Sequence, residues 1–247
     1  MGKIRFLGVR FGRRAAAVAA AAWLMIFTSG CLYPDSMRSG LQVPVRETVA
    51  AVQSAVDQYI SATSVLPIKN FTMDTPLYER YVVDFAKLSP YLGEIPPNAF
   101  EKGGTHLYVL VNAENNPQVR LLDLVTAQTV NDLALAVREY SRQHGGSLPL
   151  GEEAAAGWHA VDFELLGQPP VQVRSVFSGM YLNVLMNRKG EIIVDYGPDL
   201  AVLIREQSLT PEPETDLRAL LVEHSLYVPV KSAAYYWRNN EPSIAAG

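Results

Sequence analysis

The sequence predicts an α+β protein made of two related units, each a helix followed by a β-hairpin, with a C-terminal helix and an aromatic strand. Three observations lead to this expectation. An apolar stripe with helical spacing occurs twice, each stripe is followed by a Leu-Pro pair, and each copy ends in two β-like runs around a polar turn. The 247 residues, 49% hydrophobic and 19% charged, are enough to bury a core, which excludes intrinsic disorder for most of the chain.

The first 30 residues have the three-part layout of a secretory signal peptide. Five basic residues and no acidic residue occur in 1–14, an apolar run spans 15–27, and the small residues Ser29 and Gly30 follow. As a helix, the uncharged stretch 15–30 would be about 24 Å long, shorter than the ~30 Å hydrocarbon core of a bilayer. We therefore expect residues 1–30 to be a signal peptide rather than a transmembrane helix.

The only cysteine of the chain follows this apolar run directly. The segment Phe27-Thr28-Ser29-Gly30-Cys31 resembles the lipobox of bacterial lipoproteins. In that family the cysteine thiol receives a diacylglycerol and becomes the mature N-terminus. The resemblance therefore implies lipidation at Cys31 and a membrane partner, with the protein anchored to the cell membrane and facing outside the cytoplasm. Two acyl chains anchor a protein stably, because each buried CH₂ contributes about 0.8 kcal/mol.

Residues 31–46 contain two prolines and show no sustained periodicity until the first helix begins, which is typical of a tether. Without the five basic residues of the signal peptide, the net charge changes from −4 to −9, because 16 basic and 25 acidic residues remain. An acidic body argues against a nucleic-acid partner, which needs a basic face. A single cysteine also excludes a disulfide framework, a cysteine-rich zinc site and an iron–sulfur cluster, and we expect no cofactor.

The first unit, residues 47–126, begins with a predicted amphipathic helix over Glu47–Ser61. A Leu-Pro pair stops this helix, because proline disfavours the α conformation in the residue before it. A short capped helix is expected over Phe85–Leu92, followed by a hairpin with the strands His106–Val111 and Val119–Leu124. The apolar stripe of the first helix consists of Val49, Val52, Val56 and Tyr59.

The second unit, residues 127–206, repeats these features in the same order. Its helical stripe lies 81 positions further along the chain, at Val130, Leu133, Val137 and Tyr140. A second Leu-Pro pair, a short capped helix over Phe163–Leu166, and the hairpin strands Tyr181–Met186 and Glu191–Tyr196 follow. We interpret this order as an internal duplication. One unit is too small to bury its sheet face alone, so the two are expected to pack together.

The end of the second unit and the tail complete the predicted elements. Asp199 is expected to cap a short helix that includes Leu200 and Ile204. For the tail, residues 207–247, the sequence predicts a proline-rich linker, a helix over Asp216–His224 and an aromatic strand around Tyr235.

Two aspartates at equivalent places in the units, Asp84 and Asp162, are the candidates for a paired acid–base site. Each also stands directly before a short predicted helix, where its side chain can accept hydrogen bonds from free backbone N–H groups. Asp123 and Asp195 end the last predicted strand of each hairpin. They are likewise either acid–base candidates or residues that form the turn from a strand to a helix.

Other candidate sites are few. The histidines lack the spacing of a helical metal pair, and no nucleophile elbow, P-loop or dinucleotide fingerprint occurs. We therefore predict no metal site and assign no catalytic residue. The aromatic residues Tyr235, Tyr236 and Trp237 are the candidate contact for a glycan, peptide or protein partner, unless Tyr235 and Trp237 point into the core. The four histidines are His106, His144, His159 and His224.

Two further resemblances concern the body of the protein. A set of short motifs, from Cys31-Leu32-Tyr33-Pro34 to Val228-Pro229, resembles an uncharacterised family of predicted membrane lipoproteins from Gram-positive spore-formers. This resemblance implies a lipid anchor and no particular activity. The units are also weakly similar to the globular part of type II pseudopilins, which run through a helix, a tyrosine, a proline stop, a segment like Pro90-Tyr91-Leu92 and a small sheet.

Together these features predict a lipid-anchored extracytoplasmic protein that acts as a binding or interaction module, with a protein or the cell wall as partner. A function other than catalysis is the preferred interpretation. Two alternatives remain open: a solute-binding lipoprotein, which would need a deep interdomain pocket, and a cell-wall hydrolase that uses the paired carboxylates.

Overall fold

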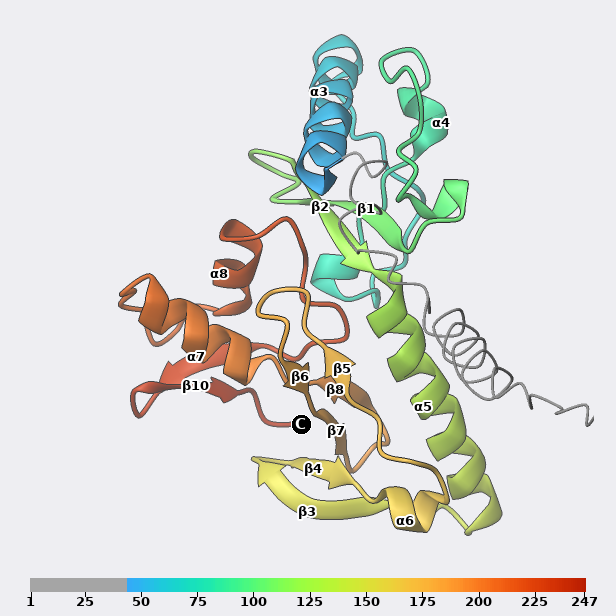
Figure 1. The fold of residues 1–247 in the computed structure, drawn as a ribbon, viewed down its shortest axis with the longest axis vertical. Coiled ribbons are helices and arrows are strands. Elements are labelled where there is room, and N and C mark those ends of the chain that lie inside the picture. The colour runs from blue at the N-terminus through green and yellow to red at the C-terminus, as the bar shows by residue number, and fades with distance from the viewer. Residues whose placement is uncertain (1–43) are drawn as a thin grey trace, which may run out of the picture. The chain divides into compact units, whose positions relative to one another are not determined.

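The structure, a computed structural model, describes residues 44–247. The predicted signal peptide, the predicted lipidation site Cys31 and most of the tether 31–46 lie outside the described residues. Helices and small antiparallel sheets alternate along the described chain (Figure 1), which confirms the predicted α+β class. No helix in this part of the chain is long and apolar enough to cross a membrane.

The first helix, α3, spans Val45–Thr63 and confirms the helix predicted over Glu47–Ser61. Its buried residues follow the predicted stripe, and Val52 and Val56 are fully covered. The helix ends at Ser64, whose backbone is left-handed and whose N–H donates to the last turn. The side chains of the stripe pack on the first hairpin, so the amphipathic pattern determines which face of the helix is buried.

The first hairpin consists of β1 (His106–Val111) and β2 (Gln118–Asp123), which pair antiparallel and lie within one residue of the predicted strands. Two isolated antiparallel bridges extend this sheet, Val82 with Val109 and Val83 with Ile68. Three short helices precede the hairpin: the 3₁₀ helices Leu77–Glu79 and Phe100–Lys102, and α4 (Phe85–Leu88), which is shorter than predicted.

The second long helix, α5, spans Leu124–Gln143, so it begins three residues before the predicted unit boundary at 127. It leads to a four-stranded sheet with the order β3-β4-β7-β8. The hairpin of β3 (Leu150–Ala155) and β4 (Trp158–Val161) was not predicted. Its local signal is the turn at Gly157, where φ is 79° and glycine is the favoured residue.

The strand predicted over Tyr181–Met186 is divided at Asn183, which corrects the prediction. β6 (Tyr181–Leu182) pairs with β5 (Val173–Arg174), whereas β7 (Val184–Asn187) pairs with β4 and with β8 (Ile192–Val194). At the division, the carbonyl of Asn183 accepts the N–H of Asp195 at 3.0 Å. The chain thus changes the strand with which it pairs within one apolar run. The pattern of apolar residues alone does not predict this change.

Equivalent backbone contacts occur in the two predicted units. Val83 pairs with Ile68 in the first, and Val161 pairs with Leu150 in the second. One residue further on, the N–H of Asp84 donates to Pro67 and the N–H of Asp162 donates to Pro149, at 2.8 and 2.9 Å. These matching contacts are what an internal duplication would produce, whereas the boundaries 47–126, 127–206 and 207–247 stay predictions. The short helix α6 (Phe163–Leu166) follows Asp162 as α4 follows Asp84.

The chain after β8 forms two helices and a last hairpin. These are α7 (Gly197–Glu206), α8 (Arg218–Glu223), β9 (Tyr235–Arg238) and β10 (Glu241–Ile244). Between α8 and β9, residues 226–231 form what we call the tail segment. Leu226 and Val228 exchange backbone hydrogen bonds with Leu121 of β2, and the carbonyl of Lys231 accepts the N–H of Val194 of β8. The tail segment therefore contacts the hairpins of both units.

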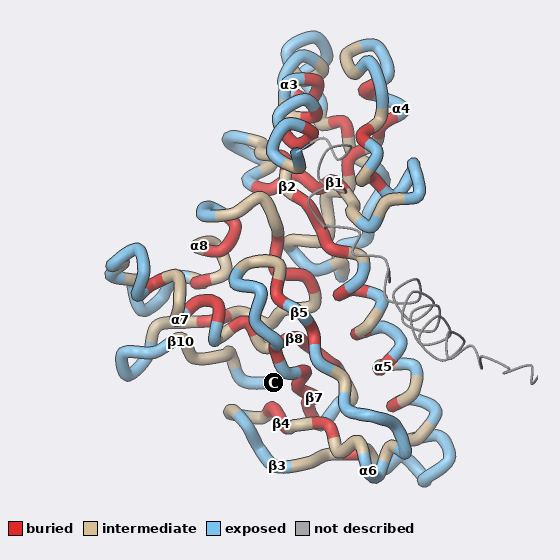
Figure 2. The backbone as a smooth tube through the Cα atoms, viewed as in Figure 1, coloured by how far each residue is buried: buried red, intermediate tan, exposed pale blue. Residues whose placement is uncertain are grey.

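Two large cores lie in the described part, and the buried stretches of strands and helices face them (Figure 2). One lies between α3, α4 and the first hairpin. The other lies between α5, the four-stranded sheet, α7, α8 and β9. Their largest fully buried side chains include Tyr108, Tyr196, Tyr235, Leu88 and Leu121.

Candidate functional site

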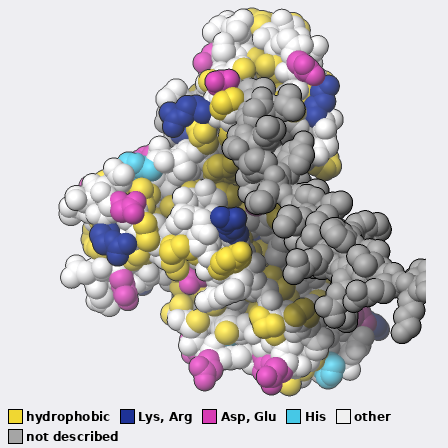
Figure 3. Space-filling model, viewed as in Figure 1, with side chains coloured by type: hydrophobic (Ala, Val, Ile, Leu, Met, Phe, Trp, Pro, Cys, Tyr) yellow, Lys and Arg dark blue, Asp and Glu magenta, His cyan; other side chains and the backbone are white. Residues whose placement is uncertain are grey.

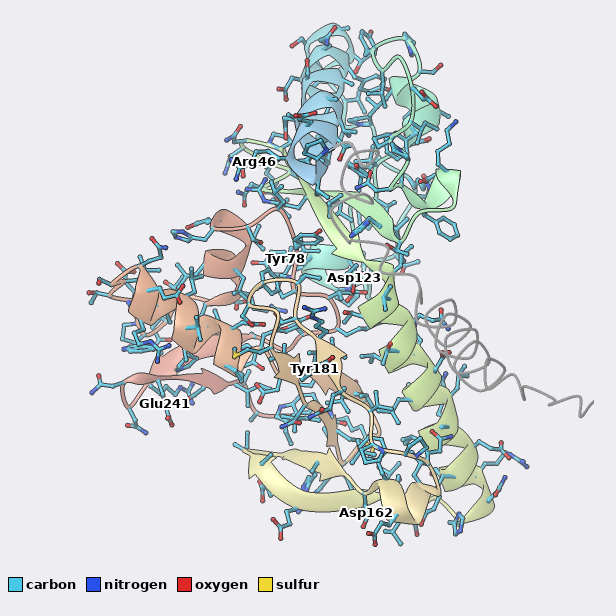
Figure 4. All side chains as sticks on the ribbon, in the orientation of Figure 1. Arg46, Tyr78, Asp123, Asp162, Tyr181 and Glu241 are labelled. Atoms are coloured by element: carbon cyan, nitrogen blue, oxygen red, sulfur yellow. The ribbon has the colours of Figure 1, made fainter. Side chains whose placement is uncertain are left out.

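The two aspartates predicted as an acid–base pair cap separate short helices. Asp84 accepts the N–H of Ala86 at 3.1 Å, and Asp162 accepts the N–H groups of Glu164 and Leu165 at 3.1 and 2.9 Å. Their helices α4 and α6 lie at opposite ends of the view in Figure 1, and Asp162 is labelled at the start of α6 in Figure 4. The structure thus favours the capping interpretation and corrects the paired-carboxylate hypothesis.

Asp123 and Asp195 both lie at strand-to-helix turns. Asp123 caps α5 (Figure 4) and accepts the N–H of Thr126 at 2.9 Å and its hydroxyl at 2.6 Å. Asp195 accepts the N–H of Gly197 at 3.0 Å. Turn formation therefore explains both positions without a catalytic role.

The four histidines lie on different elements. His106 begins β1, His144 follows α5, His159 is in β4 and His224 follows α8. Within residues 44–247, no group of three or more metal-ligating side chains is close enough to hold a metal ion.

The predicted partner contact Tyr235-Tyr236-Trp237 coincides with β9. Tyr235 is 1% exposed, and its hydroxyl donates to Asp195 and accepts the N–H of Tyr196, at 2.8 and 2.9 Å. Burial and the Asp195 carboxylate raise the pKa of Tyr235, so the hydroxyl stays a donor. Tyr235 therefore belongs to the core, which corrects its predicted surface role, whereas Tyr236 and Trp237 are half-buried and their partner contact stays a prediction.

A cavity of about 290 Å³ lies between the β5–β6 hairpin, α7 and α8. We call it the Asp199 pocket. Its apolar walls are Phe177, Val202, Leu203 and Leu221, and its polar residues are Ser178, Asp199, Glu206, His224 and Ser225. Figure 3 shows acidic side chains, a basic side chain and a histidine on the surface over α7 and α8. Glu206 and His224 of the pocket are both exposed.

Asp199 is the buried charge of this pocket, with 2% of its surface exposed. Ser175 Oγ donates to Asp199 Oδ2 at 2.7 Å, and Ser178 Oγ donates to Oδ1. The prediction that Asp199 caps α7 was wrong, because the helix begins at Gly197 and no side chain caps it. Pro198 fits the first turn, since an N–H there has no partner in the helix, and Asp199 lies in the same first turn rather than before it.

The two serines belong to the turn between β5 and β6, and the turn fixes the direction of each hydroxyl. Ser175 Oγ accepts the N–H groups of Phe177 and Ser178, at 3.0 and 3.2 Å. Ser178 Oγ accepts the N–H of Met180 at 3.2 Å. Each hydroxyl therefore accepts from the backbone and donates to Asp199, so this wall of the pocket is formed before any ligand binds.

The electrostatics of the pocket follow from the burial of one carboxylate. Burial raises the pKa of Asp199, the hydroxyls of Ser178 and Ser175 lower it, and the nearby Asp195 raises it further, so the pKa lies above its ordinary value. In the part of the chain that the structure describes, no lysine or arginine forms an ion pair with Asp199. Two neutral hydroxyls and its place in the first turn of α7, where the helix dipole favours an acidic side chain, therefore stabilise its negative charge without an ion pair.

The composition of the cavity resembles that of ligand sites. Apolar walls with a few fixed polar groups are typical of such sites.

Sequence reasoning missed this pocket because its residues come from three separate segments. These are the β5–β6 turn, α7 and the end of α8. The two serines around Val176-Phe177 are a local signal for a turn, but nothing in the sequence joins them to Asp199. Only the tertiary structure brings the hydroxyls and the carboxylate together.

The fold and the pocket together define an α+β protein with a small, partly apolar cavity around a buried carboxylate in its second half. Residues 45–123 match the model of the YphF family N-terminal domain, an uncharacterised family. The match runs from the first residue of α3 to the last residue of β2, and the Asp199 pocket lies after it. Comparisons with curated proteins and with solved structures found no match.

Proposed function

We propose that this protein is a lipoprotein, anchored through Cys31 to the outer face of the cell membrane, whose folded body binds a partner at the Asp199 pocket. The observation that carries the binding part is the pocket itself. It surrounds one buried carboxylate with apolar walls, and the hydrogen bonds of that carboxylate are fixed in advance. Preformed concave sites of this composition are typical of recognition.

The anchor rests on the amino-acid sequence. A basic segment, an uncharged stretch of 15–30 and the small residues Ser29 and Gly30 precede the only cysteine. A thiol at this place is suited to receive a diacylglycerol, and 31–46 then provides a tether to the folded body. This order of segments favours an extracytoplasmic location for residues 44–247.

The size of the Asp199 pocket suits one group of a larger partner. Its volume of about 290 Å³ is at the small end of the range of about 300–1,000 Å³ that is typical of ligand pockets. A side chain or end group of a larger partner fits such a volume. A protein or a cell-wall polymer is therefore the proposed partner.

Metabolic labelling with radioactive palmitate tests the anchor. We expect label in the wild type and in a tether control, Ser39→Ala, and no label in Cys31→Ser. Equal label in Cys31→Ser and wild type would reject lipidation at this residue. Membrane fractionation of the same strains would show whether the body is released when the label is lost.

Site-specific photo-crosslinking in intact membranes tests the pocket as the binding surface. A photo-reactive amino acid at Glu206, an exposed residue of the pocket, should give a defined adduct. The same amino acid at Glu152, an exposed residue of β3 outside the pocket, is the matched control. An adduct of equal yield at both positions, or none at Glu206, would reject the pocket as the contact.

A further inference from the structure

The buried carboxylate of Asp199 is not matched by a positive charge. An ion removed from water is costly unless an opposite charge or several strong hydrogen bonds stabilise it. Asp199 is 2% exposed, accepts from two neutral hydroxyls and has no ion pair with a lysine or arginine of residues 44–247. A cation that enters the pocket would remove this imbalance.

The carboxylate has acceptor positions that no hydrogen bond within residues 44–247 fills. An ionised carboxylate offers about four acceptor positions, two on each oxygen. Ser175 occupies one on Oδ2 and Ser178 occupies one on Oδ1. The backbone contacts of both serines hold the hydroxyls in place, so a ligand adds hydrogen bonds to Asp199 rather than replacing those of the serines.

The rest of the pocket determines what must be attached to the cation. Phe177, Val202, Leu203 and Leu221 form apolar walls, and Leu221 is 2% exposed. Glu206 adds a second carboxylate among the exposed residues of the pocket, to which His224 also belongs. Two carboxylates and apolar walls favour a positive group on a short hydrocarbon chain over an anion or a neutral sugar.

We propose that the Asp199 pocket binds an ammonium or guanidinium group carried on a short apolar chain, such as the side chain of a lysine or arginine or an aminoalkyl group. This inference rests on the proposed function in that it uses the same pocket. It is independent of the lipid anchor.

The binding of small probes to the full-length protein tests whether the Asp199 pocket selects a positive charge. NMR titration with n-butylammonium should shift the amide resonances of Ser178, Val202 and His224. 1-Butanol and butyrate, which have the same chain with a neutral or a negative end, should bind at least tenfold more weakly. Equal affinities for butylammonium and butanol would overturn the proposal.

Substitutions separate the role of Asp199 from a general effect of charge. Asp199→Asn keeps the shape of the side chain and should weaken butylammonium binding at least tenfold. Asp132→Asn, on the exposed face of α5, changes the net charge equally and should leave binding within twofold. Val202→Phe keeps the carboxylate, fills the cavity and should also abolish binding, so the test stands if Asp199→Asn fails to fold.

The outcomes distinguish this inference from the proposed function. If Glu206 crosslinks to a partner but butylammonium binds no better than butanol, the pocket binds a partner without selecting a cation, and the inference is wrong. If butylammonium binds selectively but no adduct forms at Glu206, the cation site stands and the proposed interaction function fails. Unchanged butylammonium affinity in folded Asp199→Asn would also overturn the inference.

Discussion

Aspartate side chains have two different roles in this protein, and their hydrogen-bond partners explain the difference. Asp123 accepts backbone N–H groups that would otherwise lack a partner at the start of α5, so its charge stabilises the helix. Asp199 accepts only side-chain hydroxyls and is more deeply buried. The first arrangement stabilises the fold by itself, whereas the second leaves a negative charge for a ligand to compensate.

The caps should differ in their contribution to stability. Asp123→Ala removes contacts to two backbone N–H groups and one hydroxyl, and it should destabilise the protein by about 1–2 kcal/mol. Asp84→Ala removes one backbone contact at a four-residue helix and should cost less, about 0.5–1 kcal/mol. Urea unfolding measures both, and a larger loss for Asp84→Ala would contradict the assignment.

The stability of the folded protein should depend on pH through Asp199. Burial raises the pKa of Asp199 above its ordinary value of 3.8, so the folded state holds the proton more tightly than the unfolded state. The stabilisation of the folded state by this tighter proton binding is complete below pH 3.8. It is lost as the pH rises through the raised pKa of Asp199. Between pH 4 and 7, the free energy of unfolding of the wild type should therefore fall relative to that of Asp199→Asn.

This comparison controls for the other titrating groups of the region. Asp195, Glu206 and His224 are present in both proteins, so the difference reports the loss of the Asp199 carboxyl together with its interactions with these neighbours. A difference between wild type and Asp199→Asn that stays constant from pH 4 to 7 would contradict the prediction.

At the scale of elements, a close backbone contact fixes the start of β1. The N–H of His106 donates to the carbonyl of Asn98 at 3.2 Å, and the hydroxyl of Tyr108 donates to the Asn98 side chain at 2.8 Å. Gly104 lies against the same backbone, where an added Cβ would be 2.1 Å from the Asn98 oxygen. The loop can therefore close on β1 only if residue 104 has no side chain.

Gly104→Ala should destabilise the protein by at least ~2 kcal/mol, because the clash is with backbone rather than with a flexible side chain. Gly93→Ala is the matched control, since nothing lies within 4 Å of an added Cβ there. It should change stability by no more than ~0.5 kcal/mol. Urea unfolding of the two variants checks this, and equal effects would contradict the steric explanation.

At the scale of the whole described part, the tail segment joins elements that are far apart in the sequence. It exchanges two backbone hydrogen bonds with Leu121 of β2 and accepts one from Val194 of β8. The N–H of Lys231 also donates to Glu79, and the hydroxyl of Tyr196 donates to Val230. Residues 226–231 thus couple the hairpins of the two predicted units through contacts that neither unit makes alone.

Unfolding of residues 44–247 should consequently be one cooperative transition, and Val228→Pro should weaken both units together. Proline at 228 lacks the N–H that donates to Leu121 at 3.0 Å. Val228→Ala keeps the N–H and serves as the control for lost packing. Amide hydrogen exchange should show faster opening in β2 and in β8 for Val228→Pro, and an effect confined to β2 would contradict the coupling.

The local part of the fold could be predicted from the sequence because it depends on neighbouring residues. The stripe of Val49, Val52 and Val56 repeats every 3 or 4 positions, so it predicts α3 without knowledge of what the helix packs on. Asp84 and Asp162 precede their helices by one residue, and their caps need only local backbone. The sequence likewise predicts the signal peptide and the lipidation of Cys31, which the described residues do not include.

The remaining features depend on contacts between distant residues. The apolar run from Tyr181 changes its pairing partner at Asn183, and Tyr235 is buried because Asp195, forty residues earlier, accepts its hydroxyl. Asp199 looks like a helix cap in the sequence and becomes a buried charge because a turn from another hairpin covers it. The sequence by itself determined the α+β class, α3 and the first hairpin. Only the tertiary structure decided the β3–β4 hairpin, the divided strand and the pocket, because pairing, burial and charge compensation depend on which distant segments meet.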